Sequence, residues 1–249
     1  MKFFHERTTV CETNTKYKLM FSGYCWSTGQ IKNISECRIL DAACGTGYGS
    51  YYLSERAKEV IGIDNSPKAI AFCRKKYNRK NLTFMQMNCI DLKFNDGYFD
   101  AVVTLDTIEH VSDDRRFLSE IRRVLKNNGI CIISTPNSPK HNQKPDNTYH
   151  LREYSKDSLD GLISDYFRNV TYYGRKLSEE LIKLENDLNK VRRYDLLDFR
   201  FLIPRRIRHL MADFIARVNR DRLLEEISIN DIEYFAGTHE SLTLIAICR

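Results

Sequence analysis

The sequence lacks several features that mark specialised classes of protein. No apolar run approaches the ~20 residues that cross a bilayer, and the N-terminal stretch MKFFHERTTV has no apolar core of the signal-peptide kind. No tandem repeat or low-complexity tract is visible. The eight cysteines include no C-x-x-C pair, which disfavours a zinc site or a disulfide framework and favours reduced thiols. We therefore expect a cytoplasmic protein.

The composition is that of an ordinary soluble globular chain. Of the 249 residues, 42% are hydrophobic and 29% are charged, which is usual for folded domains. This length allows one large domain, or a domain that carries an insertion, with a sizeable core.

Predicted strands and helices alternate along the chain. The predicted strands are those that end at Asp41, Asp64, Asn88 and Asp106, followed by GICIISTP, NVTYYGRK and SLTLIAIC. The predicted helices cover residues 50–57, 66–77, 113–129 with Gly129 as C-cap, and 155–167 with Ser155 as N-cap. Strands that alternate with helices predict an α/β fold with a parallel, doubly wound sheet.

Polar side chains end the first four predicted strands. In a doubly wound sheet, ligands bind beyond the C-terminal ends of the strands, where the strand order reverses. Asp64 follows Asp41 by 23 positions, close to the ~20-residue offset at which an acid meets ribose hydroxyls. Four such strand ends in register favour a nucleotide site over simple polar caps.

The segment DAACGTGYGS indicates which nucleotide is bound. Gly45, Gly47 and Gly49 form G-x-G-x-G, and Ser50 occupies the third glycine position of the dinucleotide fingerprint G-x-G-x-x-G. The carboxylate of Asp41, directly before the loop, would repel a pyrophosphate and attract an ammonium and a sulfonium. The segment therefore favours S-adenosylmethionine over NAD.

Four segments in order, "LDAACGTGYG", "VIGIDNS", "DGYFDAVVTLDTIEHV" and "RVLKNNGICIISTPN", resemble the motifs of class I S-adenosylmethionine-dependent methyltransferases. The resemblance covers roughly residues 37–176 and the terminal strand. It implies a Rossmann-like sheet of seven strands, mostly parallel with an antiparallel last strand, and a helical insertion before that strand.

The resemblance also implies the cofactor-binding residues, which are Asp41, Ala43, Cys44, Gly45, Gly47, Asp64, Asn65, Asn88, Cys89 and Leu105. The loop residues from Asp41 to Gly47 would hold the methionine part. Asp64 would bind the ribose hydroxyls with Asn65 beside it, Asn88 and the Cys89 backbone would read the adenine edge, and Leu105 would line the floor. Ala43 occupies a position where the family most often has glycine. Asn88 occupies a position where the family often has an acidic residue, but its side chain can still accept a hydrogen bond.

Asp106, Glu109 and His110 follow the fourth predicted strand, and His150 lies in the loop after the fifth. They resemble the E-x-x-E-H metal motif of ubiquinone-pathway O-methyltransferases, and that of small-RNA 3′-end 2′-O-methyltransferases, which add a histidine after the fifth strand. The resemblance implies a Mg²⁺ or Mn²⁺ site formed by these four residues, although Asp106 is one methylene shorter than glutamate.

A metal-free interpretation is open as well. Glu109 and His110 would then cap and orient the following helix, while His110 or His150 acts as the general base. His150 is equally well explained as a loop residue with no role. The short Asp106 favours the metal-free version, so His110 and His150 are the candidate catalytic residues.

The predicted organisation has four segments: an N-terminal helical cap (1–36), the cofactor-binding core (37–176), a helical insertion or lid (177–240) and the final core strand (241–249). Within the insertion, residues 192–222 hold nine arginines and four aspartates. Apolar residues at helical spacing predict a basic amphipathic helix over 200–222. We expect a lid helix; contact with a membrane surface or with phosphate groups are the alternatives. A nucleic-acid partner is not expected, because no RNA-binding module is appended.

The arrangement STPN…HLREYS resembles bacterial methyltransferases of sugar and cell-surface polysaccharide assembly. We therefore predict an S-adenosylmethionine-dependent O-methyltransferase that acts on a hydroxyl of a saccharide, nucleotide-sugar or lipid-linked glycan. Methylation of a quinone or phenol, or of an RNA 2′-hydroxyl, is the alternative within the same chemistry. A non-catalytic, S-adenosylmethionine-binding regulatory protein is the alternative of another class.

Overall fold

The computed structural model describes residues 15–139, 141, 145, 147, 149–178, 232–239 and 241–249. The chain forms two compact units, one of residues 1–10, 20–176 and 234–249, the other of residues 11–19 and 177–233. Of the second unit, only the start of the first helix and the ends of two strands are described. The basic helix predicted over 200–222 lies outside the described residues.

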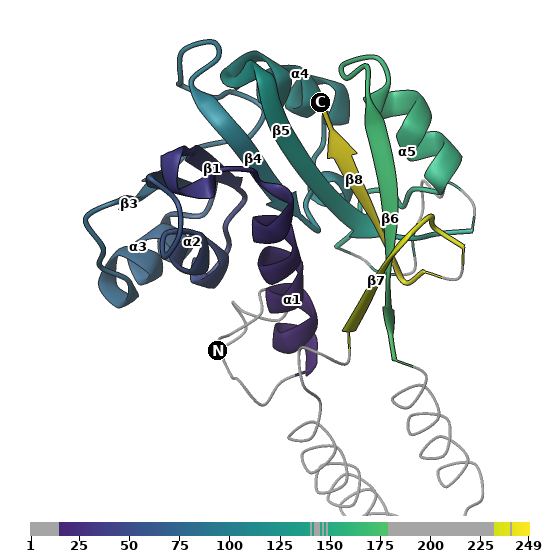
Figure 1. The fold of residues 1–249 in the computed structure, drawn as a ribbon, viewed down its shortest axis with the longest axis horizontal. Coiled ribbons are helices and arrows are strands. Elements are labelled where there is room, and N and C mark those ends of the chain that lie inside the picture. Colours follow the sequence, from purple (N-terminus) through teal and green to yellow (C-terminus); the bar gives the residue numbers. More distant parts are fainter. Residues whose placement is uncertain are drawn as a thin grey trace, which may run out of the picture. The chain divides into compact units, whose positions relative to one another are not determined.

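An eight-stranded sheet has the strand order β3-β2-β1-β4-β5-β8-β6-β7 (Figure 1). The strands are β1 (Arg38–Ala42), β2 (Glu59–Asp64), β3 (Leu82–Gln86), β4 (Phe99–Leu105), β5 (Leu125–Pro136), β6 (Val170–Leu177), β7 (Ile232–Ala236) and β8 (Thr243–Cys248). The first five strands pair in parallel, and β8 is antiparallel to both β5 and β6. The order reverses between β1 and β4, so this is the edge where a ligand is expected.

The predicted doubly wound α/β fold with an antiparallel last strand is confirmed, with one strand more than predicted. The additional strand is β7, which lies at the end of the stretch expected to be helical. Its short sequence IEYFA lies at the edge of the sheet, where pairing with one neighbour provides the order that local sequence does not signal.

The described helices are α1 (Thr15–Gln30), α2 (Tyr48–Leu53), α3 (Pro67–Lys76), α4 (Asp114–Val124) and α5 (Lys156–Ile163), with short 3₁₀ turns η2 (Ile34–Glu36) and η3 (Ile108–His110). Three of them begin at side chains that accept a hydrogen bond from the first turn: Ser66, Asp113 and Ser155. Such caps satisfy amide groups that have no partner within the helix. None of the described helices is both long and apolar enough to cross a membrane.

The strand residues alternate between two environments, because successive side chains of a strand point to opposite faces. On β1, Leu40 joins the main core, to which α4 contributes Phe117 and Ile121, each side chain stabilising the fold by about 1.5–3 kcal/mol. The next residue, Asp41, points to the other face and meets Tyr24 of α1. The core therefore fixes which strand residues face α1.

The helix predicted over 113–129 is shorter in the structure. It ends at Val124, with Leu125 as C-cap, and residues 125–128 begin β5. Gly129 is not the C-cap: a Cβ there would lie 2.7 Å from Leu125 and 3.0 Å from the Asp100 carbonyl oxygen. The glycine is needed because β5 approaches β4 closely at a register irregularity.

Two glycines should respond oppositely to substitution by alanine. A Cβ at Gly49 would overlap the ring of Tyr24, whereas one at Gly161 of α5 would meet no atom within 4 Å. We expect Gly49→Ala to lower the free energy of unfolding by about 1–3 kcal/mol. Gly161→Ala should raise it by about 0.5–1 kcal/mol, because glycine is a poor helix residue. Urea denaturation of both variants tests this, and equal midpoints would contradict the packing described.

Candidate functional site

The loop between β1 and α2 has a backbone that few residues can adopt. Ala43, Gly45 and Gly47 have φ angles of 64°, 57° and 77°, in the left-handed region that is costly for most side chains. The Cys44 amide donates to the Ile63 carbonyl at 2.8 Å, and the Gly47 amide donates to the Cys44 carbonyl at 2.9 Å. The loop therefore continues the pairing with β2 and then turns sharply into α2.

One side of this loop is packed and the other is open. A Cβ at Gly47 would lie 2.7 Å from Cys73 Sγ and 2.9 Å from the Phe84 ring, whereas one at Gly45 would meet no atom within 4 Å. The Cys73 thiol also donates to the Gly45 carbonyl at 3.4 Å. Cys73 and Phe84 therefore pack against one side of the loop, and the space beside Gly45 is open to a ligand.

Asp41 lies behind the loop and is completely buried. Its Oδ1 accepts a hydrogen bond from the Tyr24 hydroxyl at 3.1 Å, and its Oδ2 accepts one from Ser50 Oγ at 2.5 Å. Burial raises the pKa of Asp41 to about 7, although both hydrogen bonds oppose the rise. A cationic group bound at the loop would favour the charged form of this carboxyl, and its predicted role in holding the methionine part remains a prediction.

Asp64, at the end of β2, fixes the loop to the neighbouring segment. Its Oδ2 accepts a hydrogen bond from the Gly45 amide at 3.1 Å, and its Oδ1 accepts one from the Ser66 amide at 2.8 Å. Asn65 follows it and is exposed. Asp64 thus stands directly beside the open side of the loop.

The remaining predicted cofactor residues follow β3 and end β4. Asn88 is exposed, and its Oδ1 accepts a hydrogen bond from the Ile90 amide at 3.2 Å. Cys89 is half-buried, and burial raises the pKa of its thiol to about 11, so it stays protonated at neutral pH. Leu105 is buried and lies close to Gly23 of α1. All ten predicted cofactor residues therefore follow or end strands at one edge of the sheet.

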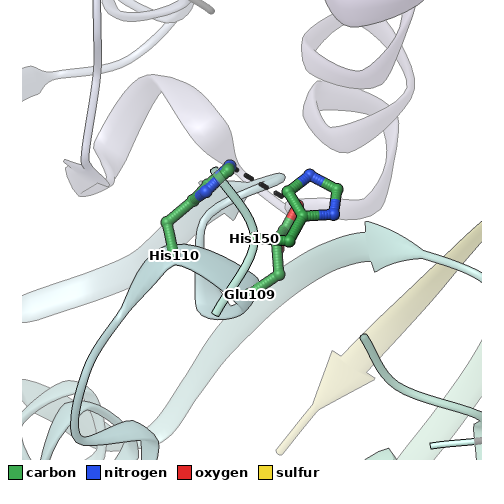
Figure 2. Close-up of side chains that lie close together, drawn as sticks. All are labelled: Glu109, His110 and His150. Atoms are coloured by element: carbon green, nitrogen blue, oxygen red, sulfur yellow. Dashed lines mark ion pairs between the residues drawn. The ribbon is translucent and has the colours of Figure 1, made fainter. Parts of the chain in front are cut away.

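A cluster of three side chains forms the second part of the site. Ligand atoms of Glu109, His110 and His150 all lie within 4.8 Å of one another, and Figure 2 shows them converging from η3 and from the loop after β5. Thr135 Oγ1 donates to Glu109 Oε2 at 2.9 Å, and His110 Nε2 lies 4.0 Å from Glu109 Oε1. The two imidazole centroids are 4.9 Å apart, at an angle of 70°.

Hydrogen bonds indicate which tautomer each imidazole adopts in its uncharged form. His110 Nδ1 lies 2.9 Å from the Tyr149 carbonyl oxygen, which can only accept, so Nδ1 carries the proton and Nε2 keeps its lone pair. His150 Nδ1 faces the Glu153 carboxylate at 3.1 Å, and its Nε2 lies 2.9 Å from Asn147 Nδ2. The basic nitrogen of His110 therefore points to Glu109, whereas that of His150 faces a side-chain amide.

Backbone and side-chain bonds hold the His150 loop against η3. The Leu151 amide donates to the Glu109 carbonyl at 2.8 Å, and Arg152 donates to the Val111 carbonyl at 3.0 Å. The Tyr154 hydroxyl donates to Asp114 Oδ2 at 2.7 Å. These contacts bring together two histidines that are 40 positions apart.

Asp106 does not join this cluster, although it was predicted as a fourth metal ligand. Its φ of 48° is left-handed, its Oδ1 accepts a hydrogen bond from Ser134 Oγ at 2.7 Å, and its Oδ2 lies 3.9 Å from Arg175. The backbone conformation and these two partners direct the carboxylate toward β5 and β6. Among the residues that the structure describes, Glu109, His110 and His150 form the one group of His, Cys, Asp or Glu side chains close enough together to hold a metal ion.

Sequence reasoning missed three residues of the site: Tyr24, Ser50 and Arg175. Nothing in α1 or α2 signals that Tyr24 and Ser50 bind Asp41, because the contact forms only when α1 packs on the sheet. Arg175 lies in β6 together with Thr171 and Lys176, so its burial is not signalled by the sequence either.

Residues 40–133 match the model of a family described as methyltransferase domain. A probable S-adenosylmethionine-dependent methyltransferase of Mycobacterium tuberculosis is 38% identical over 131 residues, which cover 51% of this chain and 47% of that protein. The fatty-acid O-methyltransferase of Mycolicibacterium smegmatis is 27% identical over 211 residues, covering 84% of this chain and 69% of that protein. The chain spans about half the length of the first of these two relatives.

Solved structures share the fold. The structure of a possible histamine N-methyltransferase from Thermotoga maritima has a TM-score of 0.61 and 16% identity, and the match covers 94% of this chain and 92% of that one. At this identity the likeness concerns the fold alone, and it agrees with the sheet described above.

The buried carboxyl of Asp41 should make stability depend on pH. Burial raises its folded-state pKa from 3.8 to about 7, so between about pH 4 and pH 7 the folded chain binds more protons than the unfolded chain. Over that window the free energy of unfolding should fall as pH rises, by up to ~1.4 kcal/mol per pH unit, and then level off.

Comparison with Asp41→Asn isolates this effect, because other ionisable groups contribute equally to both proteins. We expect the stability of Asp41→Asn relative to the wild type to increase between pH 5 and pH 7, as measured by urea denaturation. Two pH profiles that run parallel would show that Asp41 has an ordinary pKa.

Proposed function

We propose that this chain, whose core belongs to the class I S-adenosylmethionine-dependent methyltransferases, catalyses transfer of a methyl group to an oxygen of an acceptor. The observation that carries the proposal is the left-handed loop at the reversal of strand order. It is open at Gly45 and has carboxylates both behind it, at Asp41, and beside it, at Asp64. Two acids at this edge suit a cationic methyl donor better than a dinucleotide, because a pyrophosphate would meet negative charge.

The residues present fit S-adenosylmethionine, which when bound supplies a methyl group activated by its sulfonium. Asp64 lies beside the open side of the loop and accepts hydrogen bonds from the Gly45 and Ser66 amides, and we infer from the motif resemblance that it also receives the two ribose hydroxyls. The negative charge of Asp41 would stabilise the amino-acid end. We infer that Asn88 and the Cys89 backbone read the adenine edge.

For the acceptor, we propose a hydroxyl of a saccharide, nucleotide-sugar or lipid-linked glycan, on the strength of the motif resemblance. The fatty-acid O-methyltransferase relative supports an oxygen acceptor more generally. A quinone or phenol is the alternative within the same chemistry. Membrane contact through residues 200–222 remains a prediction, because that segment lies outside the described residues.

His110 is the better candidate for the general base. Its Nδ1 is held by the Tyr149 carbonyl, so the lone pair on Nε2 is available to take the acceptor's hydroxyl proton as the oxygen attacks. The nearby Glu109 carboxylate would stabilise the imidazolium that forms. His150 packs against the His110 ring and orients it.

A divalent metal is the alternative use of this cluster. One carboxylate and two imidazoles suit Mn²⁺ and are less suited to Mg²⁺, which prefers oxygen ligands. Ligation by His150 would require it to leave Asn147 or Glu153, and Asp106 faces Arg175. We therefore favour the metal-free version.

Cofactor binding should depend on Asp64. We expect Asp64→Ala to weaken binding of S-adenosylmethionine by about 1.5–3 kcal/mol, the range for hydrogen bonds to a charged group. Asp64→Asn, which keeps the shape of the side chain but not its charge, should weaken binding of S-adenosylmethionine by a part of this amount. Asp165→Ala, which removes an exposed carboxylate paired with Arg115, is the matched control. Calorimetric titration measures all four proteins, and tighter binding of NAD by the wild type would refute the proposal.

The histidine cluster can be tested by following formation of S-adenosylhomocysteine over a panel of glycans, phenols and fatty acids. In the metal-free version, EDTA has no effect, and His110→Ala lowers the rate about 10²–10⁴-fold. In the metal version, EDTA abolishes turnover and Mn²⁺ restores it. Full activity of both His110→Ala and His150→Ala on the true acceptor would leave positioning as the sole source of catalysis.

A further inference from the structure

The large hydrophobic side chains that are exposed in the described part of the chain lie in two loops at one edge of the sheet. Tyr149 is 53% exposed, Leu151 46% and Leu242 59%. One exposed apolar side chain is ordinary on a protein surface, because polar residues cannot cover all of it. Three that come together at one edge indicate a surface that binds something apolar. We call these three side chains the apolar rim.

Two members of the apolar rim flank His150. The Tyr149 carbonyl accepts a hydrogen bond from His110 Nδ1 at 2.9 Å, and the Leu151 amide donates to the Glu109 carbonyl at 2.8 Å. The side chains of Glu109, His110 and His150 lie together (Figure 2). Tyr149 and Leu151 are therefore fixed through their backbones beside the group proposed to take the acceptor's proton.

Leu242, the third member, is bonded to the start of the same loop. Its carbonyl accepts a hydrogen bond from the amide of Asn137, the first residue after β5, at 3.1 Å. Asn137 Nδ2 also donates to the Ser241 carbonyl at 2.9 Å. Two positions before Asn137, Thr135 donates to the Glu109 carboxylate. Leu242 therefore stands at the end of the strand that binds Glu109, and all of these residues belong to one compact unit.

The chemistry of the apolar rim indicates what would cover it. Leucine side chains form no hydrogen bonds, so they add no polar recognition of a hydroxyl-rich ring, whereas the transfer of methylene groups from water onto them is favourable. The histidine cluster beside the rim is polar and titratable. An apolar surface beside a polar reaction centre suits an amphipathic acceptor, in which a polar head with the reacting oxygen is joined to an aliphatic chain.

We propose that the apolar rim binds the aliphatic chain of the methyl acceptor while the polar head lies at the histidine cluster. The inference rests on the proposed function and deepens it, since it favours a lipid-linked acceptor over a free saccharide or a nucleotide-sugar. A lipid bilayer is another source of aliphatic chains. The anchoring of all three residues around the proposed base favours the acceptor's own chain.

The test titrates two series of probes into the full chain saturated with S-adenosylhomocysteine. One series is butyl, hexyl and octyl glucoside, and the other is butanoate, hexanoate and octanoate, all below their micelle concentrations. If the rim binds the chain, the dissociation constant measured by calorimetry should fall about two- to fourfold for each added methylene. The use of two head groups separates the contribution of the chain from that of the head.

Substitutions in the rim test whether it is the surface responsible. In the double variant Leu151→Gln with Leu242→Gln, which keeps the size of the side chains but makes them polar, the gain per methylene should fall below about 1.5-fold. Leu151→Met with Leu242→Met, the matched control, keeps an apolar surface and should keep the wild-type gain. Affinity for S-adenosylmethionine should be the same in all three proteins, because none of the proposed cofactor residues is altered.

A bilayer partner predicts a different set of results. Sedimentation with vesicles of phosphatidylcholine and phosphatidylglycerol measures membrane binding directly. If the rim serves a bilayer, the wild type sediments with the vesicles, the double glutamine variant does not, and the soluble probes show no gain with chain length. That set would overturn the inference. A gain with chain length that depends on the two leucines supports it whether or not vesicles are bound.

Circular dichroism establishes that each variant is folded. If the double glutamine variant does not fold, Tyr149→Ser, which leaves the carbonyl that holds His110, replaces it and should likewise lower the gain. A gain that is absent from the wild type in both series, or equal in the wild type and a folded polar variant, would overturn the inference and leave the proposed function standing. A wild type that binds no S-adenosylmethionine would overturn both.

Discussion

The carboxylate of Asp64 connects segments that are far apart in sequence. It accepts hydrogen bonds from the amide of Gly45 in the loop after β1 and from the amide of Ser66 at the start of α3. The backbone carbonyl of Asp64 accepts a third hydrogen bond, from the amide of Met87 beyond β3. Three strand ends are thereby held in one arrangement. A ligand that binds at this edge meets a loop that is already ordered, so little of its binding energy is spent on fixing the backbone.

The second half of the site depends on a different kind of connection. Here main-chain groups hold the side chains: the Tyr149 carbonyl sets the tautomer of His110, and the Leu151 amide bonds the Glu109 carbonyl. The side chains of Arg152 and Tyr154 add further bonds between the same segments, to the Val111 carbonyl and to Asp114. The position of the two histidines therefore depends on both backbone and side-chain contacts.

Much of the fold was predictable from local signals, and so was the placement of the proposed cofactor residues at one edge of the sheet. The apolar runs that form strands, the glycine loop and the helix cap at Ser155 can each be recognised from a few consecutive residues. The end of α4 was not predictable, since Gly129 looks like a helix C-cap until the neighbouring strand shows why a side chain is excluded. Likewise, β7 forms because it pairs with a neighbouring strand. Tyr24 and Arg175 are buried because elements distant in the sequence pack together.

The position of β8 between β5 and β6 has a consequence for how the chain folds. Over a hundred residues separate Pro136 from its partner Thr243. At a synthesis rate of about 5–20 residues per second, β5 waits on the order of 5–20 s for the strand that covers its edge. During that interval an apolar strand has an unpaired side, which invites aggregation. Until β8 is synthesised, the nascent chain therefore has an unpaired apolar edge at β5.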